Sequence, residues 1–277
     1  MLQRTFQMRY YLRAGTDFRN METMQTFLQE LAALGYHVVA LSEYEKIYRE
    51  GRNYVWPATD NDENLPDDAP ADASTPAGYL PQGVSLLAQG EAAKFAANKD
   101  RHLWLAAFPV AQHELTSSFS SGLSFPAQFN TASIMITLAT IGFAARTGDA
   151  LQVFERWLEL FKLMWHTWQP LYAHSYAPHT AWPEPDEEDV QAARLLYLYE
   201  INLFSPELVE QLGKTRILQT PAWKVQSLDE GSILLIPEFI FVPRGPEEKQ
   251  GDLAAQHLGL RQFLRGRYLP TPVPQDG

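Results

Sequence analysis

The sequence predicts an α+β fold in which helices cover a largely antiparallel sheet. Segments with strand-like alternation come in runs, and segments with helical spacing interrupt them singly. The chain has 277 residues, 45% hydrophobic and 12% aromatic, which gives enough apolar surface for a core. One domain is expected over residues 1–277. Each half has a weakly similar order of elements, a strand, a helix and further strands, which permits two similar lobes at residues 1–100 and 101–265.

Five strands and two helices are expected before residue 171. Apolar and polar residues alternate in Arg4–Leu12, Tyr36–Leu41, Leu103–Val110, Thr131–Ile141 and, more weakly, Gln112–Ser120. Apolar residues at helical spacing follow Asp17, the expected N-cap, and stop at Gly35. The second helix opens at Gly148 and Asp149 and ends before Pro170.

The remaining elements are shorter. Strands are expected at Tyr172–Tyr176 and Tyr197–Phe204, and in a hairpin of Trp223–Leu228 and Ser232–Ile236. Helices are expected at Asp186–Leu196, Ser205–Gly213 and Glu247–Leu258. Residues 57–81, rich in Pro, Ala, Asp and Asn, predict a long acidic loop, and the Pro-rich residues 266–277 predict a loose tail.

The net charge of −11 is concentrated in two clusters without Lys or Arg. The first contains Asp60, Asp62, Glu63, Asp67, Asp68 and Asp72, and the second Glu184, Asp186, Glu187, Glu188 and Asp189. The other 22 acids balance the 22 bases. The net negative charge argues against direct nucleic-acid binding, which needs a basic surface, and suits a basic protein partner. The alternative interpretation is that the clusters are a solvated loop and a helix start that serve solubility.

Other features of the sequence indicate where in the cell the protein resides. The chain contains no cysteine, which excludes disulfides and thiolate chemistry and fits a reducing compartment. Polar residues interrupt the N-terminal apolar residues, so no signal peptide is expected, and no apolar window is long enough for a membrane span. A cytoplasmic protein without membrane contact is therefore expected.

Motifs for catalysis are weak or missing in the sequence. There is no Gly-x-Ser-x-Gly turn, phosphate-binding glycine loop or His-Glu-x-x-His pair. His166, His174 and His179 are the best metal candidates, but gaps of eight and five residues that cross Pro170 and Pro178 disfavour a zinc site. We expect no catalytic, cofactor-binding or metal-binding residues and no cofactor.

Aromatic residues are dense between residues 165 and 182, where the sequence places Trp165, Trp168, Tyr172, Tyr176 and Trp182. Three interpretations stay open for this stretch. It forms core and a packed loop, it anchors a protein interface, or it lines an aromatic pocket of a small-molecule-binding protein or enzyme. A generic scaffold or adaptor protein is a further alternative.

Five sequence segments carry a family resemblance. They are Leu203–Val209, Leu212-Gly213, Pro221–Val225, Gly231–Leu235 and His257–Arg261. Together they resemble the type VI secretion immunity family of proteobacteria, and the layout is also similar to immunity proteins paired with restriction-endonuclease-like toxins. The sequence departs from the family pattern at Ser205, where Gly is expected. These segments consist of turn and core residues, so they indicate a fold more than a site.

The resemblance implies a non-enzymatic inhibitor that binds and neutralises its own antibacterial toxin. Combined with the charge pattern, it favours a nuclease toxin, because a nuclease presents basic residues to its substrate. The expected toxin-binding residues are Glu184, Asp186, Glu187, Glu188, Asp189, Asp60, Asp62, Glu63, Asp67, Asp68 and Trp182.

Overall fold

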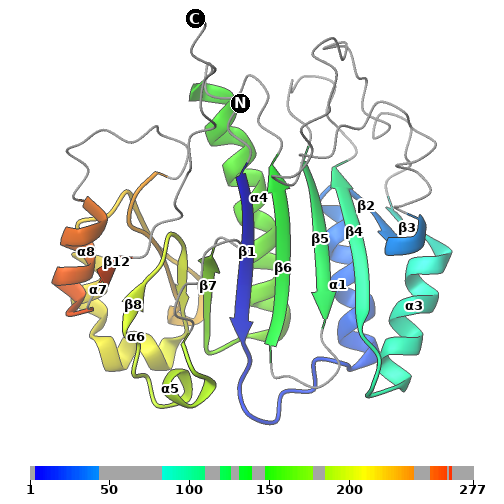
Figure 1. Cartoon of the computed structure of the whole chain (residues 1–277), viewed down its shortest axis with the longest axis horizontal. Coiled ribbons are helices and arrows are strands. Elements are labelled where there is room, and N and C mark those ends of the chain that lie inside the picture. The colour runs from blue at the N-terminus through cyan, green and yellow to red at the C-terminus, as the bar shows by residue number, and fades with distance from the viewer. Residues whose placement is uncertain are drawn as a thin grey trace, which may run out of the picture. The chain divides into compact units, whose positions relative to one another are not determined.

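The computed structural model describes residues 4–43, 83–109, 119–125, 131–138, 147–176, 185–239, 250–260 and 262–263 (Figure 1). They form an α+β fold, as the sequence predicts. The chain falls into two compact units that interleave along the sequence. Unit 1 draws on Met1–Thr5, Arg19–Gln128 and Met135–Leu163, and unit 2 draws on Phe6–Phe18, Phe129–Ile134 and Met164–Gly277.

Unit 1 contains a mostly antiparallel sheet with two helices packed on it. Its elements are α1 (Met21–Ala33), β2 (Tyr36–Ala40), β3 (Gly83–Val84), α3 (Leu86–Ala97), β4 (Leu103–Pro109) and β5 (Phe119–Phe125). Strand β4 pairs antiparallel with both β2 and β5, whereas the short β3 pairs parallel with β2. Phe27 of α1 and Phe95 of α3 both pack on Phe125 of β5, with ring centroids 6.2 and 6.0 Å away.

Two features of unit 1 correct the sequence analysis. The N-cap of α1 is Asn20 rather than Asp17, because the Asn20 side chain accepts a hydrogen bond from the Thr23 N–H at 3.1 Å. Helix α3 was not expected, and its N-cap is Ser85, whose Oγ accepts from the Ala88 N–H at 3.0 Å. Of the weak strand expected at Gln112–Ser120, residues 112–118 lie outside the described residues. Its last two residues, Phe119 and Ser120, begin β5.

Three elements cross the boundaries of the units. Strand β1 (Arg4–Tyr11) divides after Thr5, strand β6 (Thr131–Leu138) after Ile134, and helix α4 (Thr147–Trp168) after Leu163. All three were expected, and α4 ends at Trp168, two residues before Pro170. Among the described residues, no helix combines the length and apolar character needed to cross a membrane.

Unit 2 contains a five-stranded antiparallel sheet. The strands are β1 (Arg4–Tyr11), β7 (Tyr172–Tyr176), β9 (Asn202–Phe204), β10 (Lys224–Ser227) and β11 (Ile233–Ile236). They pair in the order β10-β11-β9-β7-β1. The helices are α5 (Glu187–Gln191), α6 (Pro206–Leu212), α7 (Lys214–Leu218) and α8 (Gln250–Leu258). A short parallel pair, β8 (Tyr197–Leu198) with β12 (Gln262–Phe263), was not expected.

The region before α6 is more broken than its sequence predicts. The expected helix Asp186–Leu196 stops at Gln191, because Ala193 adopts a left-handed φ of 54°. The expected strand Tyr197–Phe204 is interrupted between β8 and β9. There the Asn202 side chain accepts from the Tyr199 N–H at 3.0 Å and donates to the Tyr199 carbonyl at 2.7 Å, which fixes a turn in place of extended chain.

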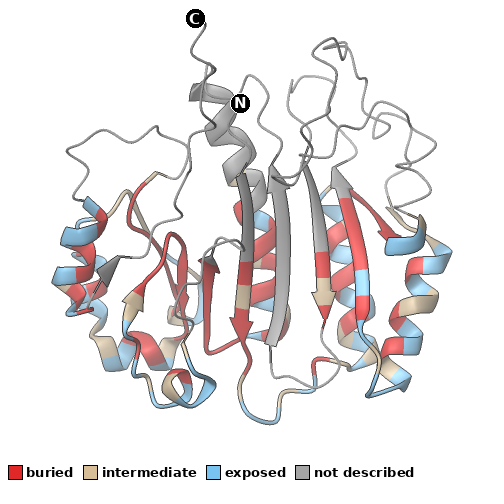
Figure 2. Cartoon of the chain, in the orientation of Figure 1, coloured by how far each residue is buried: buried red, intermediate tan, exposed pale blue. Residues whose placement is uncertain are grey.

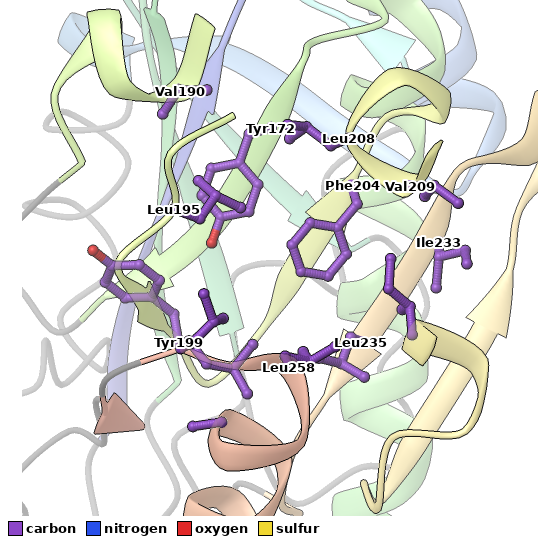
Figure 3. Packing of buried hydrophobic residues seen from close by; sticks show 14 of the residues in the cluster. Tyr172, Val190, Leu195, Tyr199, Phe204, Leu208, Val209, Ile233, Leu235 and Leu258 are labelled. Carbon is purple, nitrogen blue, oxygen red and sulfur yellow. The ribbon is translucent and has the colours of Figure 1, made fainter. Parts of the chain in front are cut away.

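One hydrophobic cluster forms the core of unit 2 (Figure 3). It joins the inner residues of β7, β9 and β11 to the buried faces of α5, α6, α7 and α8. Tyr172, Tyr199 and Phe204 are the largest of its fully buried side chains. In Figure 2, α3 and α8 each show buried residues on one side and exposed residues on the other.

Candidate functional site

Helix α5 carries four acids of the second charge cluster. Asp186 is the N-cap, and its Oδ1 accepts a hydrogen bond from the Glu188 N–H at 3.1 Å. Asp189 forms an ion pair with Arg194, with 2.7 Å between Oδ1 and Nη2. Glu187 and Glu188 are exposed. Asp186 and Asp189 therefore hold the local structure, and Glu187 and Glu188 are the acids best placed to meet a partner.

Contacts with the end of β1 fix α5 in place. The Tyr11 hydroxyl donates to the carbonyl of Pro185 at 3.2 Å, and the Gln191 side chain donates to the carbonyl of Leu12 at 3.1 Å. Val190 is completely buried in the core of unit 2. A five-residue helix is too short to be stable alone, so these tertiary contacts hold it. The exposed acids thus sit on a fixed support.

A buried histidine lies among the aromatic rings of this region. The ring of His174 stacks on Tyr199 at 3.9 Å, Tyr172 at 5.6 Å and Tyr11 at 5.7 Å between centroids. The Tyr11 hydroxyl lies 3.4 Å from His174 Nε2. Burial lowers the pKa of His174 to about 3, so the ring is neutral at physiological pH. His174 therefore serves the packing of the layer that supports α5.

Asn202 connects three strands of the same region through hydrogen bonds. Besides its two bonds to the Tyr199 backbone, its Oδ1 accepts from the Tyr172 hydroxyl at 2.9 Å. Its Nδ2 also donates to the carbonyl of Leu235 at 3.4 Å. A buried amide with this many partners fixes one arrangement of the strands around it.

The segments that carry the family resemblance pack together. We call residues 202–239 and 250–260, which include β9, α6, α7, β10, β11 and α8, the C-terminal module. Its inner residues belong to one cluster, whose members from the resembling segments are Phe204, Leu208, Val209, Ile233, Leu235, Leu258 and Leu260 (Figure 3). Ser205, where the family pattern has Gly, is buried and caps α6 through its Oγ, which accepts from the Leu208 N–H at 3.4 Å.

The predicted binding residues divide into two groups. Asp186, Glu187, Glu188 and Asp189 lie together on α5. The others lie outside the described residues, namely Asp60, Asp62, Glu63, Asp67, Asp68, Glu184 and Trp182. The sequence analysis missed Arg194 and Tyr11, whose roles depend on a turn and on contacts distant in sequence.

The aromatic and histidine candidates have structural places. Trp165, Trp168 and Tyr172 are buried, which contradicts their use as exposed interface anchors and supports the core interpretation. His166 is exposed on α4, His174 is buried on β7, and His179 is outside the described residues. No group of three or more metal-ligating side chains occurs in the part of the chain that the structure describes.

Comparisons with known proteins found a distant structural similarity and no match to a family model or a curated protein. Among solved structures, a T6SS protein of Pseudomonas aeruginosa is similar over 93% of this chain and 73% of its own, with 10% sequence identity and a TM-score of 0.45. A similarity of this degree identifies neither an activity nor a partner.

Proposed function

We propose that this protein is an immunity protein that binds and neutralises a type VI secreted antibacterial toxin, without chemistry of its own. The observation that carries the proposal is the C-terminal module. Sequence segments spread over residues 203–261 resemble the immunity family, and those of their residues that the structure describes pack around one core. A resemblance made of mutually contacting residues is a better indication of a shared architecture than the same letters scattered over a structure.

The charge pattern favours a nuclease as the toxin. A nuclease must present basic groups to phosphates, and an acidic protein can occupy that surface. Glu187 and Glu188 meet this need directly, because they are exposed on a helix held by contacts of Tyr11, Val190 and Gln191. The acids from Asp60 to Asp72 supply a second negative charge, which we propose acts mainly by attracting the toxin before contact.

The small-molecule alternative loses its main support. It needs the aromatic residues between 165 and 182 to line a pocket, but Trp165, Trp168 and Tyr172 pack into the protein interior. His174, the buried titratable residue nearest to them in sequence, is occupied by stacking on three tyrosines. We therefore propose neutralisation by binding, in the cytoplasm, where an incoming nuclease reaches its substrate.

Co-purification tests this proposal. The tagged protein is expressed together with the inactivated product of the gene adjacent to its own, and the complex is isolated at low salt and analysed by size and mass. We expect a complex of fixed stoichiometry, and coexpression of the active product with this protein should restore growth. If the two proteins elute separately and coexpression gives no protection, the proposal is wrong.

A further inference from the structure

Three exposed leucines gather at one corner of unit 1. Leu41 follows the end of β2, and Leu86 and Leu87 begin α3. Their exposed fractions are 39%, 86% and 41%. Figure 1 shows β3 and the start of α3 beside β2. We call these three residues the leucine patch. Grouped exposed apolar side chains are typical of surfaces that bind another protein.

The end of β2 and the start of α3 are tied to each other by hydrogen bonds. The Glu43 carboxylate accepts from the Ala40 N–H at 2.9 Å and also from the Ser85 hydroxyl. The Ser85 N–H donates to the carbonyl of Val38 at 2.9 Å, which continues the parallel pairing of β2 with β3. These bonds place Leu41 close to Leu86 and Leu87 and hold the backbone that carries all three.

Helix α3 is also held at its other end, so the leucine patch sits on a firm element. The Arg19 guanidinium lies 4.2 Å from the centroid of the Phe95 ring and donates to the carbonyl of Phe95 at 3.0 Å. It also donates to the carbonyl of Asn98 at 2.6 Å, beyond the last turn of α3. A patch on a fixed backbone loses little entropy when a partner covers it.

Charge indicates the kind of partner that fits. The sequence between Glu43 and Gly83, the two residues that flank the patch along the chain, contains eight acids and three bases. This net negative charge is covalently tethered on both sides of the leucine patch. A partner that covers the leucines therefore enters a negative potential, which favours a basic protein over an acidic one or a second copy of this chain.

We infer that the basic toxin proposed above docks an apolar surface on Leu41, Leu86 and Leu87 of unit 1. The inference rests on the proposed function. The site consists of the three leucines. The acids raise the association rate, and the leucines, once desolvated, slow dissociation.

The test compares two variants of the full chain for binding to the inactivated product of the adjacent gene. The first is the triple variant Leu41→Ser/Leu86→Ser/Leu87→Ser. The matched control is Leu34→Ser, which changes a leucine that is 47% exposed in the same unit, at the opposite end of β2. We expect the dissociation constant of the triple variant to rise by about tenfold or more, mainly through faster dissociation, and that of the control to stay unchanged.

The outcomes distinguish three possible coverings of the leucine patch, namely the toxin, another part of this chain and a second copy of it. Equal binding by the wild type and the triple variant contradicts this inference but leaves the proposed function standing, whereas a wild type that does not bind contradicts both. A thermal midpoint lowered by more than about 5 °C in the triple variant means that the leucines are covered by this chain itself. A concentration-dependent wild-type dimer that the triple variant cannot form means that a second copy covers them. Either of these last two results also overturns the inference.

Discussion

Arg216 and His257 each donate a side-chain hydrogen bond to the backbone carbonyl of the other. Arg216 Nε lies 2.8 Å from the carbonyl oxygen of His257, and His257 Nε2 lies 2.9 Å from that of Arg216. This reciprocal pair ties α7 to the last turn of α8 in the C-terminal module. It also explains the Gly259 that follows, because a Cβ at that position would lie 2.8 Å from Arg216 Nη2.

Replacing Gly259 with Ala is expected to destabilise the protein. Gly259 has a φ of +71°, and the added Cβ would also push Arg216 away from His257. We expect a loss of about 1–2 kcal/mol in the free energy of unfolding, measured by urea denaturation. The control is Gly90→Ala in α3, where nothing lies within 4 Å, and it should stabilise by about 0.5–1 kcal/mol. Equal effects of the two changes would contradict this account of Gly259.

Elements with strong local periodicity could be predicted from the sequence. Helix α4 and strand β1 were found within about two residues of their ends, because their patterns repeat over many residues. Helix α3 was missed for a physical reason. Its buried face consists of Ala88, Ala92 and Phe95, which give little hydrophobic contrast, while its most apolar residues, Leu86 and Leu87, are exposed. The apolar residues of α3 thus lie on the wrong face for the periodicity to indicate a helix.

Replacing Asn202 with Ala tests the hydrogen bonds by which this residue connects three strands of unit 2. The change leaves the Tyr172 hydroxyl and the Tyr199 backbone without the amide that now bonds them. We expect a loss of about 3 kcal/mol in the free energy of unfolding, because buried polar groups lose their partners. Tyr172→Phe removes one of these bonds and should cost about 1 kcal/mol. If Asn202→Ala lowers the free energy of unfolding no more than Tyr172→Phe does, the remaining hydrogen bonds of Asn202 contribute little to stability.

Acid should destabilise the wild type through His174. Burial lowers its pKa from 6.5 to about 3 in the folded protein, so protons bind the unfolded chain preferentially between these values. The stability that this residue contributes is present above pH 6.5 and falls as the pH drops toward 3. Each pH unit in this window costs a factor of about ten in the folding equilibrium constant.

The control for this prediction is His174→Phe, which keeps an aromatic ring beside Tyr199 but cannot be protonated. Denaturation at several pH values between 7 and 4 should give a flatter stability profile for the variant than for the wild type. Parallel profiles would mean that His174 contributes nothing to the acid sensitivity of the protein.

Glu187→Gln/Glu188→Gln is expected to slow association with the toxin and flatten its salt dependence. Both residues are exposed, so the free energy of unfolding should change by less than about 0.5 kcal/mol. Stopped-flow association rates at several salt concentrations provide the measurement. Glu210→Gln/Asp252→Asn removes two exposed acids from α6 and α8 and is the matched control. Equal slowing by the two variants would indicate a general charge effect and not contact through α5.

The first acidic cluster gives a parallel comparison. Neutralising Asp60, Asp62, Glu63, Asp67, Asp68 and Asp72 should slow association further while leaving the dissociation rate nearly unchanged, since long-range attraction acts before contact. An increased dissociation rate would mean that these acids contact the toxin directly.

The candidate site was only partly predictable. The acids at the start of α5 were expected to complement a helix N-terminus, and Asp186 is indeed the N-cap. The pairing of Asp189 with Arg194 was not, because a spacing of five residues does not place two side chains together on a helix. It arises from the left-handed turn at Ala193. The anchoring of Pro185 by Tyr11 joins residues 174 positions apart and has no local signal.

Titration of toxin activity by this protein tests the central claim most directly. Increasing amounts of the protein are added to a fixed amount of the active adjacent-gene product, and the residual nuclease activity is measured against the molar ratio. Neutralisation by tight binding predicts a linear fall to zero at a fixed molar ratio, with full activity recovered when the complex is dissociated. Inactivation of many toxin molecules by one molecule of this protein, or activity unchanged at molar excess, would contradict the account.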